Sequence, residues 1–195
     1  GESTTLNNMG EAYGALGEKD KALDLFNRAL TIRRTIDDKM GQANTLNSIG
    51  ALYAAYHEQR KALEFITQAL SLFQAAGNRI GEATTLTNMG GIYSALGETQ
   101  KALDFYNRSL ALRKAAGDLN GEANTLGNIG TLYSNAGDAK RAMEFLVSAL
   151  AIRNAIDDRP GEALPLLPAA ELARGGSHRA ARRAGREPGA GRGGR

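Results

Sequence analysis

The chain has 195 residues, of which 42% are hydrophobic and 23% are charged, and its formal net charge is +3. It contains no cysteine, which excludes a disulfide framework, a thiolate metal site and a cysteine nucleophile. The charge is uneven, because residues 171–195 carry seven arginines and two glutamates, a net +5, which leaves −2 for residues 1–170. We therefore expect no nucleic-acid binding by the main part of the chain, because it lacks the basic surface of such proteins.

The beginning of the chain bears on its location. It starts at Gly1 without an initiator methionine, and it has no basic-then-apolar leader. No run of about 18 apolar residues is present, so we expect no membrane segment and a cytoplasmic location. Because the repeat described next is already in phase at Gly1, we expect a fragment of a longer array or a tag remnant.

A motif recurs every forty residues along most of the chain. Gly-Glu-Ala begins at Gly81, Gly121 and Gly161, and Gly-Gln-Ala begins at Gly41. Three columns keep the same register: glycine at Gly10, Gly50, Gly90 and Gly130, tyrosine at Tyr13, Tyr53, Tyr93 and Tyr133, and alanine at Ala22, Ala62, Ala102 and Ala142. Four copies, at residues 1–40, 41–80, 81–120 and 121–160, follow without a slip in register, which predicts a repeat architecture.

Each copy is predicted to form two helices. In the third copy, one face of a first helix is marked at i, i+3, i+4 and i+7 by Leu86, Met89, Gly90 and Tyr93. Gly97 breaks this helix, and a second helix with Ala102, Tyr106 and Ser109 on one face runs to about Ala116. The small residues of the glycine and alanine columns let the two helices approach closely. In the first copy the helices span about residues 2–15 and 18–36, and four-residue linkers at 37–40, 77–80, 117–120 and 157–160 join the copies.

This pattern resembles the tetratricopeptide repeat, a helix-turn-helix unit. The first copy matches its signature with Leu6, Met9, Gly10, Tyr13, Ala22, Phe26 and Ala29, and the other copies keep the same columns. The unit of forty residues is similar to the long-repeat subclass of kinesin light chains, Pins-type adaptors and bacterial signalling proteins. The resemblance implies an all-α, right-handed superhelix that acts as a protein–protein interaction scaffold, with the first helices lining its concave surface.

The first helices carry a polar stripe opposite their packing face. The stripes are Thr4, Asn8, Glu11 and Ala15; Asn44, Ser48, Ala51 and Ala55; Thr84, Asn88, Gly91 and Ala95; and Asn124, Asn128, Thr131 and Asn135. By resemblance they face the groove. Ten polar members, the wall residues, are the candidates for binding a peptide: Asn8, Glu11, Asn44, Ser48, Thr84, Asn88, Asn124, Asn128, Thr131 and Asn135.

The composition of the stripes favours a ligand-contacting wall. Asparagine offers both a donor and an acceptor for the backbone of an extended peptide, and the small residues Ala51, Gly91 and Ala95 leave room for it. Asparagine and threonine are mediocre helix formers, so a face without a function would more naturally carry Glu, Lys or Ala. The alternative is that they only keep the surface soluble. Because no lysine or arginine lies in the stripes, we expect no binding of a C-terminal carboxylate tail of the kind that chaperone-binding members hold.

Other candidate sites are weaker. Asp37 and Asp38 could hold a cation, but no third ligand lies near them, and a solvated helix end is favoured. His57 replaces a turn glycine and His178 lies in the tail, so no catalytic set, metal site or cofactor site is predicted, and we expect no enzyme. The glycines precede no strand, so a phosphate-binding loop is not indicated. The column Arg33, Arg113 and Arg153 suits a helix C-terminus, with an anion-binding role as the alternative.

The repeat fails after Gly161-Glu162-Ala163. We predict a degenerate capping helix within residues 161–174, centred on 168–173, whose leucines cover the end of the fourth copy. Residues 175–195 are predicted to be a disordered basic tail, either a contact for nucleic acid or acidic lipid or, as we favour, an out-of-frame or vector-derived end. The favoured function is a scaffold that holds a partner peptide or helix. The alternative is a structural spacer or array segment with end-to-end self-association.

Overall fold

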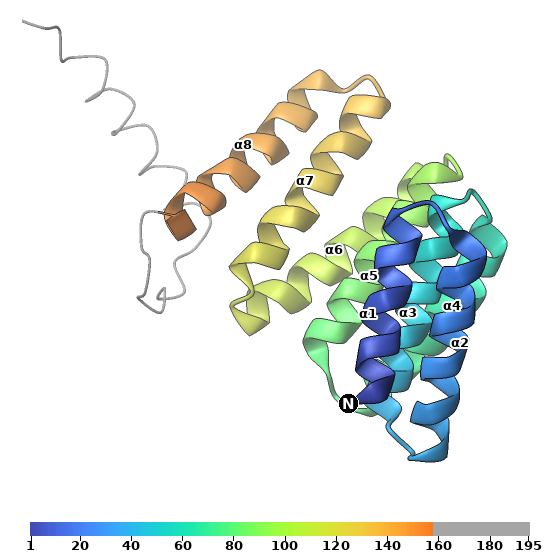
Figure 1. The fold of residues 1–195 in the computed structure, drawn as a ribbon. Coiled ribbons are helices and arrows are strands. Elements are labelled where there is room, and N and C mark those ends of the chain that lie inside the picture. The colour runs from blue at the N-terminus through green and yellow to red at the C-terminus, as the bar shows by residue number, and fades with distance from the viewer. Residues whose placement is uncertain (158–195) are drawn as a thin grey trace, which may run out of the picture.

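The computed structural model describes residues 1–157, and these fold into eight α-helices (Figure 1). The helices are α1 (Glu2–Ala15), α2 (Lys19–Thr35), α3 (Lys39–Ala55), α4 (Gln59–Ala75), α5 (Arg79–Ala95), α6 (Thr99–Ala116), α7 (Leu119–Asn135) and α8 (Ala139–Asp157). The expected all-α class is confirmed, and the predicted ends of the first two helices agree with the structure to within one residue. The predicted capping helix and tail lie outside the described residues.

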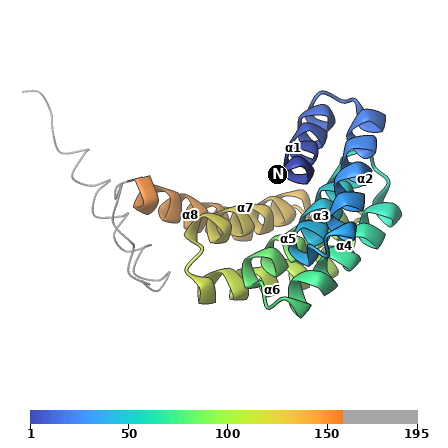
Figure 2. The ribbon, with the colours of Figure 1, turned by 60° about the horizontal axis from the view of Figure 1, so that its bottom comes forward.

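The helices are arranged as antiparallel pairs that stack into a curved array. Each helix packs most extensively on its partner in the pair, and α3, α5 and α7 each also contact the preceding odd-numbered helix. Figure 2 shows α1, α3, α5 and α7 toward the inside of the curve and α2, α4 and α6 along its outside. This arrangement is the predicted repeat superhelix, with the first helices of the pairs on its concave side.

The glycine column is the point of closest approach within each pair. A Cβ atom on Gly90 would lie 2.6 Å from the ring of Tyr106, and one on Gly10 would lie 2.7 Å from the ring of Phe26. The alanine column faces it and is fully buried at Ala102. Because real carbon atoms pack at about 3.5–4.0 Å, no other residue fits the glycine column without displacing its neighbour.

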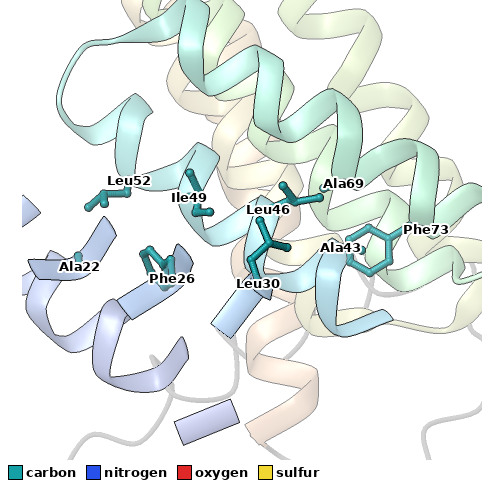
Figure 3. Packing of buried hydrophobic residues seen from close by; sticks show 9 residues of the cluster. All are labelled: Ala22, Phe26, Leu30, Ala43, Leu46, Ile49, Leu52, Ala69 and Phe73. Carbon is teal, nitrogen blue, oxygen red and sulfur yellow. The ribbon is translucent and has the colours of Figure 1, made fainter. Parts of the chain in front are cut away.

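Successive pairs bury apolar side chains between them. In Figure 3, Phe26 and Leu30 of α2 point toward Ile49 and Leu46 of α3. The same columns recur between α6 and α7, where Tyr106 packs with Ile129 and Leu132. The core is therefore a ribbon that continues from one pair to the next, as expected for a solenoid.

The linkers between pairs are shorter than predicted. In the expected linkers at 37–40, 77–80 and 117–120 the last two residues are already helical, because α3, α5 and α7 begin at Lys39, Arg79 and Leu119. The reason is an N-cap: the side chains of Asp38, Asn78 and Asp118 each accept a hydrogen bond from the backbone N–H of the glycine three residues later. These residues start the next helix rather than extend a turn. Of the fourth expected linker, only Asp157 lies within the described residues, and it is the last residue of α8. The division of the chain at residues 40, 80 and 120 stays a prediction.

The turns require a left-handed backbone conformation at one residue each. Glycine takes this position at five turns, with φ between 65° and 81°. Asp37 and His57 take it at the other two, with φ of 53° and 59°. The replacement of a turn glycine by His57, noted in the sequence, therefore places a side chain in an unfavourable backbone conformation.

Candidate functional site

All ten wall residues lie on the four inner helices, α1, α3, α5 and α7, and none of them is buried. Seven are exposed, and Ser48, Thr84 and Asn88 are half-buried. The structure thus leaves these ten side chains accessible on the inner helices.

Hydrogen bonds tie neighbouring inner helices along this face. Glu11 of α1 accepts from the hydroxyl of Ser48 on α3 at 2.9 Å and from the amide of Asn7 at 2.9 Å. Asn88 of α5 donates from Nδ2 to Oδ1 of Asn47 on α3 at 3.0 Å. Asn47 was not among the predicted wall residues. Asn47 directly precedes the wall residue Ser48 but lies off the predicted stripe. Its contact with Asn88 depends on how α3 packs against α5, which the sequence does not show.

A hollow of about 330 Å³ opens on the concave side, where α3, α5 and α7 meet. Five of its eleven lining residues belong to the predicted stripes: Ala51, Asn88, Gly91, Ala95 and Asn128. The others lie outside the stripes: Ala54, Gln59, Ile66, Thr87, Ile92 and Tyr106. None of its lining residues carries a charge. The predicted combination of amides with small side chains therefore produces a concave, neutral surface with hydrogen-bonding groups.

The arginine column has a structural role that the sequence did not reveal. Arg33 is 5% exposed, and its guanidinium donates to the carbonyl of Gly41 at 2.7 Å and to the hydroxyl of Thr45. Arg113 is 8% exposed and forms an ion pair of 2.5 Å with Asp118, the N-cap of α7. Both arginines therefore connect the end of one outer helix to the start of the next inner helix.

Two arginines of this column also form hydrogen bonds with wall residues. Arg113 Nη2 donates to the hydroxyl of Thr84 at 3.1 Å, and the exposed Arg153 donates from Nη2 to Oδ1 of Asn124 at 3.1 Å. The stripes themselves contain no arginine, as noted from the sequence. Folding nevertheless brings one exposed guanidinium, that of Arg153, next to the wall at α7. A reading of the stripes alone misses it because Arg153 lies on a different helix.

The paired carboxylates and the turn histidine have local explanations. Asp38 caps α3, and Asp37 forms an ion pair of 2.5 Å with Lys39. His57 is exposed at its turn. Among residues 1–157, no group of three or more histidine, cysteine, aspartate or glutamate side chains is placed to hold a metal ion. His178 lies outside that range. In the same part of the chain, no helix combines the length and the apolar character needed to cross a bilayer.

The turn edge of the array repeats one cluster of aromatic and charged groups. Tyr93 stacks on Phe105 with ring centroids 5.2 Å apart, and Lys101 lies over the Tyr93 ring at 5.2 Å. In the preceding pair, hydrogen bonds from Lys19 and from Lys61 lower the pKa of the Glu58 carboxyl. The lysines along this edge are thus paired with carboxylates or aromatic rings of the chain itself, which leaves few unpaired charges there for a ligand.

The outer face of the second helices is polar, and the Asp–Arg spacing of i, i+4 that recurs in it forms an ion pair on α2 but not on α6. Arg28 lies 3.8 Å from Asp24, at an exposed position where such a pair contributes little. The equivalent Asp104 instead accepts a hydrogen bond from Gln100 at 3.0 Å, while Arg108 lies over the ring of Phe105 at 5.6 Å. The first pair has Leu25 at the position of Phe105, so Arg28 has no equivalent ring beside it.

Comparison with known proteins supplies relatives for this fold. The family model described as tetratricopeptide repeat matches residues 1–75, 61–115 and 81–155. A comparison with curated proteins gives no match.

Solved structures show the same architecture. BtubC (BKLC) from P. vanneervenii is 23% identical, covers 85% of this chain and 70% of its own, and has a TM-score of 0.68. MamA is 19% identical with a TM-score of 0.58, covering 80% of this chain and 81% of its own. A putative kinesin light chain from Podosopora anserina, with nearly identical TPR-like repeats, is 15% identical with a TM-score of 0.63, covering 93% of this chain and 88% of its own. At these identities the likeness concerns the fold.

Proposed function

Because the chain belongs to the tetratricopeptide repeat family, whose arrays are protein–protein interaction scaffolds, we propose that its concave face binds an extended segment of a partner protein. The observation that carries this proposal is the neutral hollow of about 330 Å³ on that face, lined by Asn88, Asn128 and Gly91. Binding sites are typically concave, with a few polar groups that orient the ligand. The role is one of binding without catalysis or cofactor, and the cytoplasmic location stays a prediction.

The chemistry of the wall favours an extended segment over a helix. A carboxamide presents one acceptor and two N–H donors, which match the free carbonyl and N–H groups of an extended backbone. A bound helix has already satisfied its backbone groups internally, so it gains little from a row of amides. Each direct hydrogen bond contributes about 1 kcal/mol, and several along the groove give measurable affinity.

A selection experiment tests the proposal. The full chain is immobilised and used to select from a display library of random dodecapeptides, and the dissociation constants of the enriched peptides are measured. We expect the double substitution Asn88→Ala with Asn128→Ala to weaken binding at least ten-fold. The matched control is Asn27→Ala with Asn107→Ala, which removes two exposed amides from the outer helices α2 and α6. Equal loss of binding in both double variants, or loss only in the control, would contradict a concave site.

A second candidate function, a self-associating array segment, is favoured by one observation. The outer helix α8 exposes Met143, Leu146 and Leu150, which are 62%, 41% and 56% exposed. Their counterparts on α6, including Tyr106, are packed against the next inner helix α7. The α1 helix of a second copy could pack on α8 as α7 packs on α6. In α1, Met9 is 44% exposed, and it occupies the repeat position that is buried at Ile129 in α7.

Such head-to-tail contacts do not close on themselves, so they would produce growing chains. The test is the molar mass of the full chain by light scattering over a range of concentrations. Growth in mass that the double substitution Met143→Glu with Leu150→Glu abolishes would support this second function. A constant monomer mass at all concentrations excludes it and leaves the groove proposal unaffected.

A further inference from the structure

Gly91 is a glycine that packing does not require. It lies inside α5, where glycine is a poor helix former. A Cβ atom added there would meet only the hydroxyl of Tyr106, at the ordinary contact distance of 3.7 Å. Its neighbour Gly90 differs, because a Cβ at that position would lie 2.6 Å from the Tyr106 ring. The absence of a side chain at Gly91 therefore has no packing role, and it leaves the hollow open.

The base of this hollow holds the hydroxyl of a largely buried tyrosine. Tyr106 is only 4% exposed, and its hydroxyl points at the space that a side chain on Gly91 would occupy. This hydroxyl forms no hydrogen bond with any group among residues 1–157, and burial raises the pKa of the phenol, so it remains a neutral donor. The same column holds Phe26, Ile66 and Leu146 in the other pairs, and none of these carries a hydroxyl.

Acceptors lie around the same hollow. Gln59 lines it, and the carboxamide oxygen of Gln59 is buried without a partner in the described part of the chain. Asn88 uses its Nδ2 to donate to Asn47 and keeps its own oxygen available. The hollow thus offers the Tyr106 hydroxyl and the Asn128 carboxamide as donors together with amide oxygens, while the hydroxyl of Thr87, which also lines it, donates to the Ala83 carbonyl. None of its lining residues is charged.

We propose that this hollow is a pocket for one neutral carboxamide side chain, asparagine or glutamine, of the segment that the groove binds. The inference rests on the proposed groove function. The Tyr106 hydroxyl donates to the carbonyl oxygen of the ligand side chain, and the oxygens of Gln59 and Asn88 accept from its NH₂ group. A carboxylate or an ammonium group is disfavoured, because it would lose hydration without meeting an opposite charge.

The test uses the dodecapeptides selected by the full chain. We expect the enriched peptides to share Asn or Gln at one aligned position, and replacement of that residue by Glu or Lys to raise the dissociation constant at least ten-fold. Gly91→Leu, which fills the hollow, should raise it at least ten-fold. Tyr106→Phe removes one hydrogen bond and keeps a ring that Phe26 shows to be compatible with this column, so it should raise the constant about five-fold.

The control is Gly127→Ala, which removes a helical glycine in open space on α7 without reaching the hollow, and it should leave binding unchanged. Enriched peptides without a preference for Asn or Gln, or equal binding by Gly91→Leu and the unmodified chain, would overturn the pocket and leave the groove function standing. A selection that enriches no peptide would overturn the groove function and the pocket together.

Discussion

The adjacent residues Gly90 and Gly91 provide a matched pair of substitutions in one helix. Gly90→Ala places a methyl group 2.6 Å from two ring carbons of the buried Tyr106. Gly91→Ala places the same group 3.7 Å from the hydroxyl of that tyrosine and touches nothing else within 4 Å. Both residues are helical, so both substitutions gain the same helix propensity, and only the packing differs.

The magnitudes follow from these distances. Replacing glycine by alanine inside a helix stabilises it by about 1 kcal/mol. Overpacking a buried contact costs about 1–3 kcal/mol, and a methyl group that is about 1 Å too close belongs at the upper end of that range. We therefore expect Gly90→Ala to lower the free energy of unfolding by about 2 kcal/mol and Gly91→Ala to raise it by about 1 kcal/mol.

Thermal unfolding followed by circular dichroism at the helical band measures the difference. For a chain of this size, 1 kcal/mol corresponds to about 2–4 °C in the midpoint. Gly90→Ala should lower the midpoint by about 4–8 °C, and Gly91→Ala should raise it by about 2–4 °C. If both variants unfold at the same temperature, the close approach of α5 and α6 at Gly90 is not what the structure indicates, and the account of the glycine column fails.

Three further substitutions, together with one control, test the turns, a buried acid and the arginine column. His57→Gly relieves the left-handed strain at the turn after α3 and should stabilise the chain by about 1 kcal/mol; an unchanged midpoint would show that the turn carries no strain. Burial raises the pKa of Glu122, so the folded state holds that proton more tightly than the unfolded state, and stability falls as pH rises from the usual range of a glutamate through the raised pKa. Glu122→Gln should thus stabilise the chain at neutral pH, with a gain that disappears at acidic pH; a gain independent of pH would contradict the burial of charge. Arg113→Ala leaves Asp118 without its partner and should destabilise by about 3 kcal/mol, whereas Lys101→Ala on the surface should change stability by about 0.5 kcal/mol or less; urea unfolding that finds equal effects would refute the linking role of Arg113.

The fold was largely predictable because local periodicity and repetition carry it. The spacing of Leu86, Met89 and Gly90 marks one helix face, and buried positions recur every forty residues. The N-caps were missed, although Asp38, like Asn78 and Asp118, stands three residues before a glycine at the start of each inner helix. Read together as a column, these residues signal a helix start.

The candidate site was only partly predictable. The exposure of the wall residues follows from helical geometry within one helix. The hollow depends on how three inner helices come together, and the hydroxyl of Tyr106 reaches it only because the ring lies beneath the empty position at Gly91. The contact of Arg113 with Asp118 likewise joins two helices whose relative placement periodicity does not specify.

The most direct test of the concave binding site is a map of backbone amide chemical shifts in the full chain, recorded with and without the most enriched dodecapeptide. We predict that the shifted amides lie on the inner helices α3, α5 and α7, with the largest changes around Asn88, Gly91 and Asn128, which surround the hollow. Changes confined to the outer faces of α4 and α6, or to the exposed apolar face of α8, would contradict the central claim that this scaffold binds its partner in the groove.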